Sequence, residues 1–432
     1  MSKRYQKIDD AANAMAMPDV VSVSLAEIAA DMKEGLLALA VGAGLQVMAA
    51  MFAEDVQQMC GPRGKHDADR RGYRHGTEAG SVTLGGRRVP VDRPRVRAAD
   101  GSSELKLPTY EVFSSTETLS GMAMTRMLSG LSSRRYPVGL EPVGARVELT
   151  ATGTSRSAIS RRFVASTETV LEQMLAADLS KLDLVALMVD GVWFAEHLAV
   201  VVLGIGIDGT KHPLALADGS TENASLVRDL LVSLRERGLD VTRPILAVLD
   251  GSKALRRAVL DVFEHPVIAR CQLHKIRNVT DKLPQHMRPA VAKMMRKAYH
   301  ADSALAAQGQ LEALARELDK THPNAAGSLR EGLEDTLTVL RLDLPPSLLR
   351  TFRSTNAVES MISISREHAK NVKRWRDAPM ALRWCAAGMV EASKQFRRVN
   401  GHLHLPTLRA ALERETVKNV VATPHNEEVN AA

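Results

Sequence analysis

Short apolar runs alternate with turn signals between residues 184 and 273, and this pattern predicts the central sheet of the protein. Three runs rich in Val, Ile and Leu follow one another closely, and their short connections favour antiparallel hairpins. They are Leu184–Val189, Leu198–Ile207 and His212–Ala217. A helical segment follows, and then a strand, a helix and a strand, an order that requires right-handed parallel crossovers. These segments are Asn223–Arg237, Ile245–Leu249, Ser252–Phe263 and Val267–Arg270. Three antiparallel strands followed by two parallel ones indicate an α/β fold with a ribonuclease-H-like mixed sheet.

Two Asp-Gly pairs follow the first and fourth predicted strands, which are neighbours in this order. They are Asp190-Gly191 and Asp250-Gly251, and we expect their carboxylates to face one another at matching strand ends. An isolated Asp-Gly pair is ordinary turn chemistry, because Asp bonds its own backbone and Gly supplies positive φ. Paired carboxylates at adjacent strand ends are instead what a hard cation such as Mg²⁺ prefers. Asp208 and Asp218 also precede Gly, but they fall at the far ends of hairpins and are interpreted as turns.

A Cys-x-x-His element, Cys271 and His274, follows the last predicted strand. It is half of a zinc site with no second half nearby in the sequence, so metal binding is disfavoured. A packed cysteine and a histidine turned toward the active cleft are the favoured interpretation. Residues 280–345 then predict several amphipathic helices, which we interpret as a helical insertion.

A further helix is predicted to begin near Thr355 or Asn356, after the break at Pro345-Pro346. Its buried stripe is expected to contain Val358, Ile362, Ser365, Ala369 and Val372. Glu359 lies at the head of an adjacent basic face. Either Glu359 belongs to a helix cap on a solvated face, or it is a third metal-binding carboxylate on a helix whose cations hold a DNA backbone.

The composition places this sheet in a basic chain of more than one domain. The 432 residues are 45% hydrophobic and carry a formal net charge of +7, with a pI near 9.3. This charge indicates a polyanionic partner. Three cysteines predict no disulfide framework, and the N-terminus lacks the pattern of a signal peptide, so we expect a cytoplasmic protein. The apolar segment Gly35–Ala53 favours a soluble amphipathic or oligomer-forming helix over a membrane span.

The region from Cys60 to Arg97 is rich in Arg and Gly and predicts a basic loop and a hairpin that turns at Gly85-Gly86. Cys60, His66 and His75 lack the paired spacing of a structural zinc site, so a phosphate-contacting basic ribbon is favoured.

Residues 114–164 predict helices around a segment, 131–150, that looks irregular and linker-like. Gly153–Val164 is typical of the second helix of a helix-turn-helix unit, with Arg156, Arg161 and Arg162 meeting DNA phosphates. A capped surface helix explains the same residues equally well.

Taken together in their order and spacing, several elements resemble the Mutator-type transposases of bacterial insertion sequences. They are Asp190-Gly, Asp250-Gly, Cys271-x-x-His274 and the segment STNAVES with Arg366 seven residues after Glu359. The resemblance runs from about residue 50 to 415 and includes the basic hairpin and GTSRSAISRRF. It implies a ribonuclease-H-like catalytic domain, a helical insertion before the last acid, and an Asp-Asp-Glu triad at Asp190, Asp250 and Glu359.

This triad predicts cleavage and strand transfer of DNA with two Mg²⁺ or Mn²⁺ ions, with Asp190 bridging both. We expect phosphate contacts from Arg366, Lys370, Lys373 and Arg374, and either base stacking or core packing by Trp375 and Trp193. The expected partners are the terminal inverted repeats of its own element, target DNA and a second copy of the chain, in the nucleoid of a bacterium. A metal-dependent nuclease or resolvase, or a catalytically silent DNA-binding protein, are the alternatives.

The domain organisation that these patterns predict has six parts. They are an N-terminal helical region (1–60), a DNA-binding region (61–170), the first part of the catalytic core (171–279), the insertion (280–345), the C-terminal helices of the core (346–415) and a disordered tail (416–432).

Overall fold

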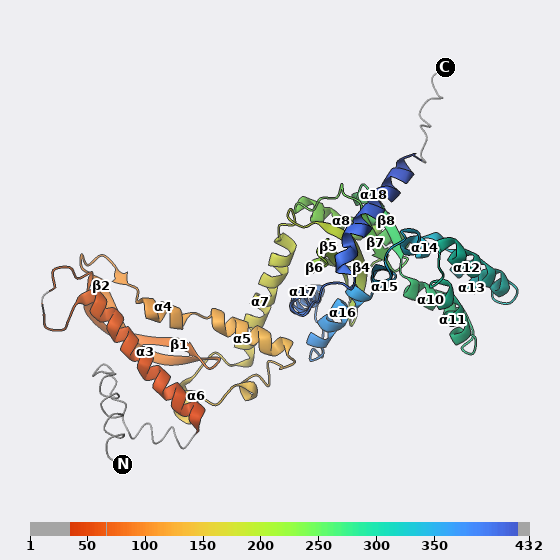
Figure 1. Cartoon of the computed structure of the whole chain (residues 1–432). Helices are drawn as coiled ribbons and strands as arrows, with labels where there is room; N and C mark the ends of the chain where they lie inside the picture. The colour runs from red at the N-terminus through yellow and green to blue at the C-terminus, as the bar shows by residue number, and fades with distance from the viewer. Residues whose placement is uncertain (1–34, 66, 422–432) are drawn as a thin grey trace, which may run out of the picture. The chain divides into compact units, whose positions relative to one another are not determined.

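A computed structural model describes residues 35–65 and 67–421 of the chain. It divides into two compact units, residues 1–166 and 167–432, which are treated separately below (Figure 1). The expected features at residues 1–34, His66 and residues 422–432 lie outside the described residues.

The first unit is built on a β-hairpin with a long helix lying along it (Figure 1). Strands β1 (Gly72–Leu84) and β2 (Arg87–Ala98) pair antiparallel, and Leu84 lies opposite Arg87. The predicted turn at Gly85-Gly86 is therefore confirmed. Strand β1 begins at Gly72, so part of the expected basic loop is strand. A short strand, β3 (Glu104–Leu105), extends the sheet beside β2.

Helix α3 (Leu36–Cys60) buries one side against this hairpin. Met48 and Phe52 pack with Val82 and Val89, and Val56 packs with Val96. Within the described residues, its segment Ala38–Cys60 is the one helix long and apolar enough to cross a membrane by length and composition. Its contacts with the hairpin give the buried members, Met48, Phe52 and Val56, a packing role, but only 17% of the apolar window is buried.

The arginines of the hairpin are largely engaged within the protein. Arg93 and Arg95 form ion pairs with Glu78 and Glu104. Arg88 donates to the Thr83 hydroxyl at 3.2 Å and to the Ser114 carbonyl at 2.6 Å. At these positions each guanidinium is used in cross-strand or tertiary bonds within the protein. The phosphate-contacting ribbon stays a prediction.

The rest of the first unit consists of helices and irregular connections. The helices are α4 (Pro108–Ser114), α5 (Glu117–Leu128), the 3₁₀ turn η1 (Pro137–Gly139), α6 (Ala145–Thr150) and α7 (Arg156–Ala176), which continues into the second unit. The expectation that 131–150 is irregular is confirmed for residues 131–144, apart from the turn η1, whereas residues 145–150 form α6. The segment is nevertheless packed rather than linker-like. Tyr136 is fully buried, and Leu140 and Val143 lie against the glycines of the hairpin turn. The segment is fixed by tertiary packing, which leaves no regular hydrophobic period in its sequence.

The second unit contains the predicted five-stranded mixed sheet, in the order β6-β5-β4-β7-β8. Strands β4, β5 and β6 are antiparallel neighbours, and β7 and β8 continue the sheet in parallel. Their bounds are β4 Leu184–Phe194, β5 His197–Gly206, β6 Lys211–Asp218, β7 Ile245–Leu249 and β8 Pro266–Arg270. The strand order expected from the apolar runs is therefore confirmed.

Two positions in the sheet differ from the expectation. Asp190-Gly191 does not end its strand, because β4 continues to Phe194 in a hairpin with β5, and Asp190 lies opposite Val201. Asp218 ends β6 opposite Ala199, which puts it at the same edge of the sheet as Asp190 rather than at the far end. The first difference arises because β4 extends past the end of its shorter neighbour β7. The second arises because β6 runs antiparallel to β5 and so ends beside the start of β5.

Helices cover both faces of this sheet. The core on one face includes α8 (Ala224–Glu236) and α9 (Lys253–Val262). On the other side α16 (Asn356–His368) packs on β4, and α17 (Ala378–Lys394) packs on β5, β6 and α16. Of the predicted buried stripe, Val358, Ile362, Ser365 and Ala369 are buried, whereas Val372 is partly buried and lies beyond the end of α16.

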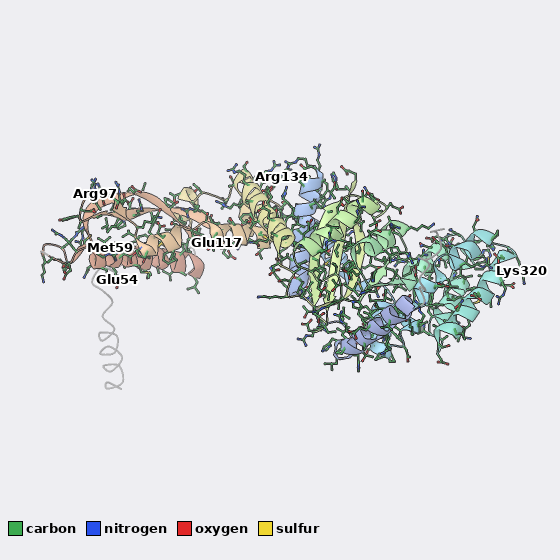
Figure 2. All side chains as sticks on the ribbon, turned by 90° about the horizontal axis from the view of Figure 1, so that it is seen from above. Glu54, Met59, Arg97, Glu117, Arg134 and Lys320 are labelled. Atoms are coloured by element: carbon green, nitrogen blue, oxygen red, sulfur yellow. The ribbon has the colours of Figure 1, made fainter. Side chains whose placement is uncertain are left out.

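The expected helical insertion has its own core, in which α10 to α14 pack together. Its helices are α10 (Gln272–Thr280), α11 (Arg288–Ala298), α12 (Ala304–Asp319), α13 (Pro323–Arg330) and α14 (Leu333–Arg341). Helix α15 (Pro346–Phe352) leads back to the sheet. Figure 2 shows Lys320 at the end of the insertion furthest from the sheet.

The C-terminal part differs from the expectation in two ways. Helix α16 ends at His368, so Lys370, Lys373 and Arg374 lie beyond it and do not continue its basic face. Helix α18 (Leu405–Val421) continues past residue 416, where a disordered tail was expected to begin.

Candidate active site

Two strands bring Asp190 and Asp250 together. Strands β4 and β7 pair in parallel with a constant offset of 60 residues, since Ala186 lies opposite Leu246 and Met188 opposite Val248. Asp250 also follows Asp190 by 60 residues. Alternation along a strand sends Leu249 into the core beneath α8 and α9, so Asp250 belongs to the opposite side of the sheet, where α16 lies.

The Asp250 turn is held in a specific conformation. The Asp250 Oδ1 accepts a 2.8 Å hydrogen bond from the Ser252 amide, and the Ser252 hydroxyl caps α9 by accepting from the Leu255 amide. Gly251 has a φ of +109°, and a Cβ there would lie 2.2 Å from the Arg270 Nε. This turn therefore requires glycine for both its backbone conformation and its close approach to Arg270.

Asp190 is a carboxylate in an unfavourable environment. Burial raises its pKa to about 6. A 2.8 Å hydrogen bond from the Gly191 amide and the positive charge of His274 oppose that rise, whereas Asp250 and Glu359 add to it. The negative charge of Asp190 is therefore only partly compensated by its protein neighbours. A bound cation would stabilise that charge.

Glu359 reaches this cluster from the first turn of α16. Its Oε1 accepts a 2.8 Å hydrogen bond from the Thr355 hydroxyl and lies 3.9 Å from the His274 Nε2. Thr355 is fully buried and occupies the N-cap position of α16, yet its side chain makes no cap bond. Its hydroxyl lies 3.4 Å from the His274 Nδ1 and 3.5 Å from the Cys271 Sγ.

Thr355 is thus a contact of the site that the sequence pattern did not reveal. A threonine before a helix is ordinarily interpreted as a cap, and its four-residue spacing from Glu359 is the available sequence signal. The unused cap indicates that its hydroxyl orients Glu359 and links it to His274.

The Cys-x-x-His element lies at the same place. Cys271 directly follows β8 and is fully buried, and His274 is in the first turn of α10. Burial favours the neutral thiol, but hydrogen bonds from His274 and Thr355 lower the pKa of Cys271 overall. The hydrogen bond with Cys271, aided by the charges of Asp190 and Glu359, raises the pKa of His274 despite its burial.

Cys271, His274 and Glu359 also form a group whose ligand atoms all lie within 4.8 Å of one another. Metal binding was disfavoured from the sequence because no second half of a site lies near Cys271. Glu359 comes from a position 88 residues beyond Cys271, which only the folded chain brings close. The expectation that His274 turns toward the carboxylates is borne out by its contacts with Glu359 and Asp190.

The cations that were expected to bind DNA differ in their surroundings. Arg366, Lys373 and Arg374 are exposed, whereas Lys370 is exposed but paired with Glu367. In α7, Arg156 and Arg161 are exposed. Arg162 is partly buried and donates to the Gly153 carbonyl, so its guanidinium is engaged within the first unit.

The two tryptophans considered for base stacking also differ. Trp375 packs against Phe194 and Trp384, with ring centroids 4.8 Å and 6.3 Å apart, so core packing accounts for it. Trp193 is 56% exposed on β4.

Comparison with known proteins identifies the class to which this fold and site belong. The profile of the family described as "Transposase, Mutator family" matches residues 19–399. The chain is 29% identical over 290 residues to the transposase for insertion sequence element IS6120 of Mycolicibacterium smegmatis, covering 66% of this chain and 87% of the relative. It is 25% identical over 376 residues to the transposase for ISRM5 of Rhizobium meliloti, covering 84% and 90%. The transposase for IS256 in transposon Tn4001 of Staphylococcus aureus is 22% identical over 321 residues, covering 68% and 78%.

The chain belongs to the Mutator family of transposases. The family resemblance inferred from its motifs is therefore confirmed, and as a transposase it acts on DNA.

Proposed function

We propose that this protein is an insertion-sequence transposase that cleaves the ends of its own element and joins them to target DNA at a metal-dependent Asp-Asp-Glu site. Asp190, Asp250 and Glu359 are the catalytic carboxylates, on a sheet with the strand order of ribonuclease-H-like enzymes. The names of its relatives support the transposition of an insertion sequence. In this proposal the protein recognises the terminal inverted repeats of its own element and acts on DNA as a homodimer.

The observation that carries this proposal is the convergence of three carboxylates from distant parts of the chain. Asp190 lies in β4, Asp250 follows β7 and Glu359 is in α16. The charges of Asp250 and Glu359 both act on Asp190. Carboxylates repel one another, so three together in a half-buried site are costly unless a cation joins them.

The donor set fits Mg²⁺ or Mn²⁺, because carboxylate oxygens are the ligands that hard divalent cations take. The raised pKa of Asp190 supports this fit, since its charge lacks sufficient compensation from the protein. Asp190, Asp250 and Glu359 would hold the ions. When bound, the ions supply Lewis-acid chemistry, activating a water or a 3′-hydroxyl and stabilising the leaving oxygen of the phosphodiester.

The remaining residues of the site position these carboxylates. Thr355 holds Glu359 through its hydroxyl, and the Ser252 amide holds Asp250. His274, whose pKa is raised, offsets part of the negative charge of Asp190 and Glu359. The exposed Arg366, Lys373 and Arg374 would contact DNA phosphates.

The test is a cleavage and joining assay on DNA that carries the ends flanking the coding sequence, with Mg²⁺ or Mn²⁺ and with Asp250→Asn as the variant. We expect 3′-hydroxyl ends and joined products from the wild type and none from the variant. Asp218→Asn is a matched control, because Asp218 also precedes Gly at the same edge of the sheet but has no part in the cluster.

Different outcomes separate the alternatives. Cleavage without joining would favour a nuclease or resolvase. Binding to the ends without cleavage by the wild type would favour a catalytically silent DNA-binding protein. Full activity of Asp250→Asn would contradict the assignment of the triad.

A further inference from the structure

A second group of cations lies on the helical insertion, away from the residues considered so far. Lys293, Arg296 and Lys297 are spaced at i, i+3 and i+4 on α11, so they share one face of that helix. All three are exposed. Over residues 35–65 and 67–421, none of the three is found in an ion pair.

Two adjoining hollows extend this face toward α15. One has a volume of about 490 Å³ and is lined by Lys293, Arg296, Lys297 and His300. The other has a volume of about 250 Å³ and is lined by His300, Arg350 and Arg353 among other residues. His300 joins the two, since its Nε2 lies 2.7 Å from the guanidinium of Arg353.

The surface begins beside the active site. Gln272, at the edge of the second hollow, directly follows Cys271, and its amide donates to the Arg353 carbonyl at 2.9 Å. Arg353 in turn precedes Thr355 by two residues. A DNA strand whose reacting phosphate lies at the carboxylates would therefore meet this surface within a short distance.

The charge of the surface is unbalanced. Lys293, Arg296, Lys297, Arg350 and Arg353 form the set named here the α11 surface. Among the residues that the structure describes, Asp302 is the one acid that lines either hollow. Exposed cations on a solvated helix are usually accompanied by acids at i±3 or i±4, as Lys320 is by Glu317 elsewhere in the insertion. Unpaired cations of this density suit a partner that brings its own negative charges.

We propose that the α11 surface binds the phosphodiester backbone of the DNA that continues out of the active site. This rests on the proposed function for the position of the reacting phosphate. Binding is electrostatic and independent of the base sequence. The surface offers guanidinium and ammonium groups, which contact phosphates rather than base edges. Its role is to hold the duplex in register while the carboxylates act on it.

The test measures the affinity of the full-length protein for a duplex that carries the element end and its flanking sequence, in EDTA so that no cleavage occurs. The variant is Lys293→Gln/Arg296→Gln/Lys297→Gln. Each phosphate contact contributes about 0.9 to the slope of log K against log salt concentration. We therefore expect weaker binding and a slope shallower by up to about 2.7, with unchanged circular dichroism because the three side chains are exposed.

The matched control is Lys320→Gln/Arg330→Gln/Arg341→Gln, which removes the same charge from the same insertion. Those three cations are already paired with Glu317, Asp319 and Glu415, so we expect little change in slope. Equal effects of the two triple variants would overturn the proposal, since they would reflect net charge alone. So would an unchanged slope in the α11 variant.

A second measurement needs no variant. In the wild type, bound DNA should protect Lys293 and Lys297 from chemical acetylation and leave Lys320 reactive; equal reactivity with and without DNA would contradict the proposal. Trimming the duplex on the flanking side, and separately on the element side, shows which DNA the surface contacts. Removal of the DNA that the α11 surface contacts should weaken binding of the wild type but not of the α11 variant.

These results are distinguishable from a failure of the proposed function. If Asp250→Asn stays active and the α11 variant shows a shallower salt dependence of binding, the assignment of the triad is wrong and the DNA-binding role of the α11 surface is supported. If Asp250→Asn is inactive and the α11 variant binds DNA as the wild type does, the assignment of the triad is supported and the DNA-binding role of the α11 surface is wrong.

Discussion

The replacement of Asp190 by Asn should make the metal-free protein more stable while abolishing catalysis. Burial raises the pKa of Asp190 to about 6 from an ordinary value of 3.8, so the ionised carboxylate is disfavoured in the folded state. Each pH unit between the two values corresponds to about 1.4 kcal/mol. At neutral pH the folded protein therefore loses about 3 kcal/mol by keeping Asp190 ionised, and the neutral amide of Asn avoids this loss.

The sign of the pH dependence follows from the raised pKa. Below pH 3.8 Asp190 is protonated in both states and carries no penalty. As the pH rises from 3.8 to about 6, the unfolded chain ionises while the folded protein holds its proton, so the wild type loses stability relative to the variant. Above about pH 6 the difference is complete. We expect roughly half of it at pH 5.

The assay is denaturant unfolding in EDTA between pH 5 and 8, followed by tryptophan fluorescence. All three tryptophans, Trp193, Trp375 and Trp384, belong to the second unit, so the signal reports on the unit that holds the site. Addition of Mg²⁺ should stabilise the wild type and have less effect on Asp190→Asn, because a ligand that binds only the folded state stabilises it by mass action.

Asp240→Asn is the matched control and should change stability in the opposite direction. Hydrogen bonds from the hydroxyl and amide of Thr242 lower the pKa of Asp240, so its ionised form is favoured by the fold. The reasoning would be refuted if Asp190→Asn were no more stable than the wild type at pH 7 in EDTA.

Three further predictions concern neighbouring parts of the second unit. Thr355→Val should slow cleavage by about 10- to 100-fold through loss of the bond that orients Glu359, and Thr355→Ser should restore it; equal rates for the two variants, measured on end-carrying DNA, would show that the hydroxyl is dispensable. Gly251→Ala should destabilise the unit by more than about 2 kcal/mol, since its φ is +109° and its Cβ would meet a guanidinium. Gly309→Ala in α12, where a Cβ meets nothing within 4 Å, should instead stabilise by about 0.5–1 kcal/mol in the same thermal unfolding series. Trp375→Ala should cost about 3 kcal/mol as a packed aromatic, whereas Trp193→Ala, at an exposed position, should stay within about 0.5 kcal/mol; similar losses in urea unfolding would mean that Trp193 is also buried.

The central sheet was predictable because its signals are local. Strand β7 was predicted with its observed bounds, Ile245–Leu249, since a short buried parallel strand is a continuous apolar run between turn residues. The caps of α8 and α9 are Asn223 and Ser252, which were the expected first residues of these helices. Strand order then followed from chain connectivity, and with it the pairing of Asp190 with Asp250.

Other features were not predictable because long-range packing decides them. The segment 131–150 looked irregular, yet its apolar residues are fixed against the turn of the hairpin. The arginines of that hairpin suggested a nucleic-acid surface, but Glu78 and Glu104 neutralise Arg93 and Arg95 from across the strands. Spacing along one strand does not reveal which charges lie opposite it.

The sequence by itself determined the elements of this transposase, their order and the residue types available for chemistry, because hydrophobic period, turn residues and caps act over a few positions. Only the tertiary structure decided which of those residues meet. It let β4 continue past Asp190, placed the Thr355 hydroxyl beside Cys271 and His274, and brought those two residues beside Glu359. Contacts between positions 80 or more residues apart depend on how the helices pack on the sheet, and no local pattern encodes them.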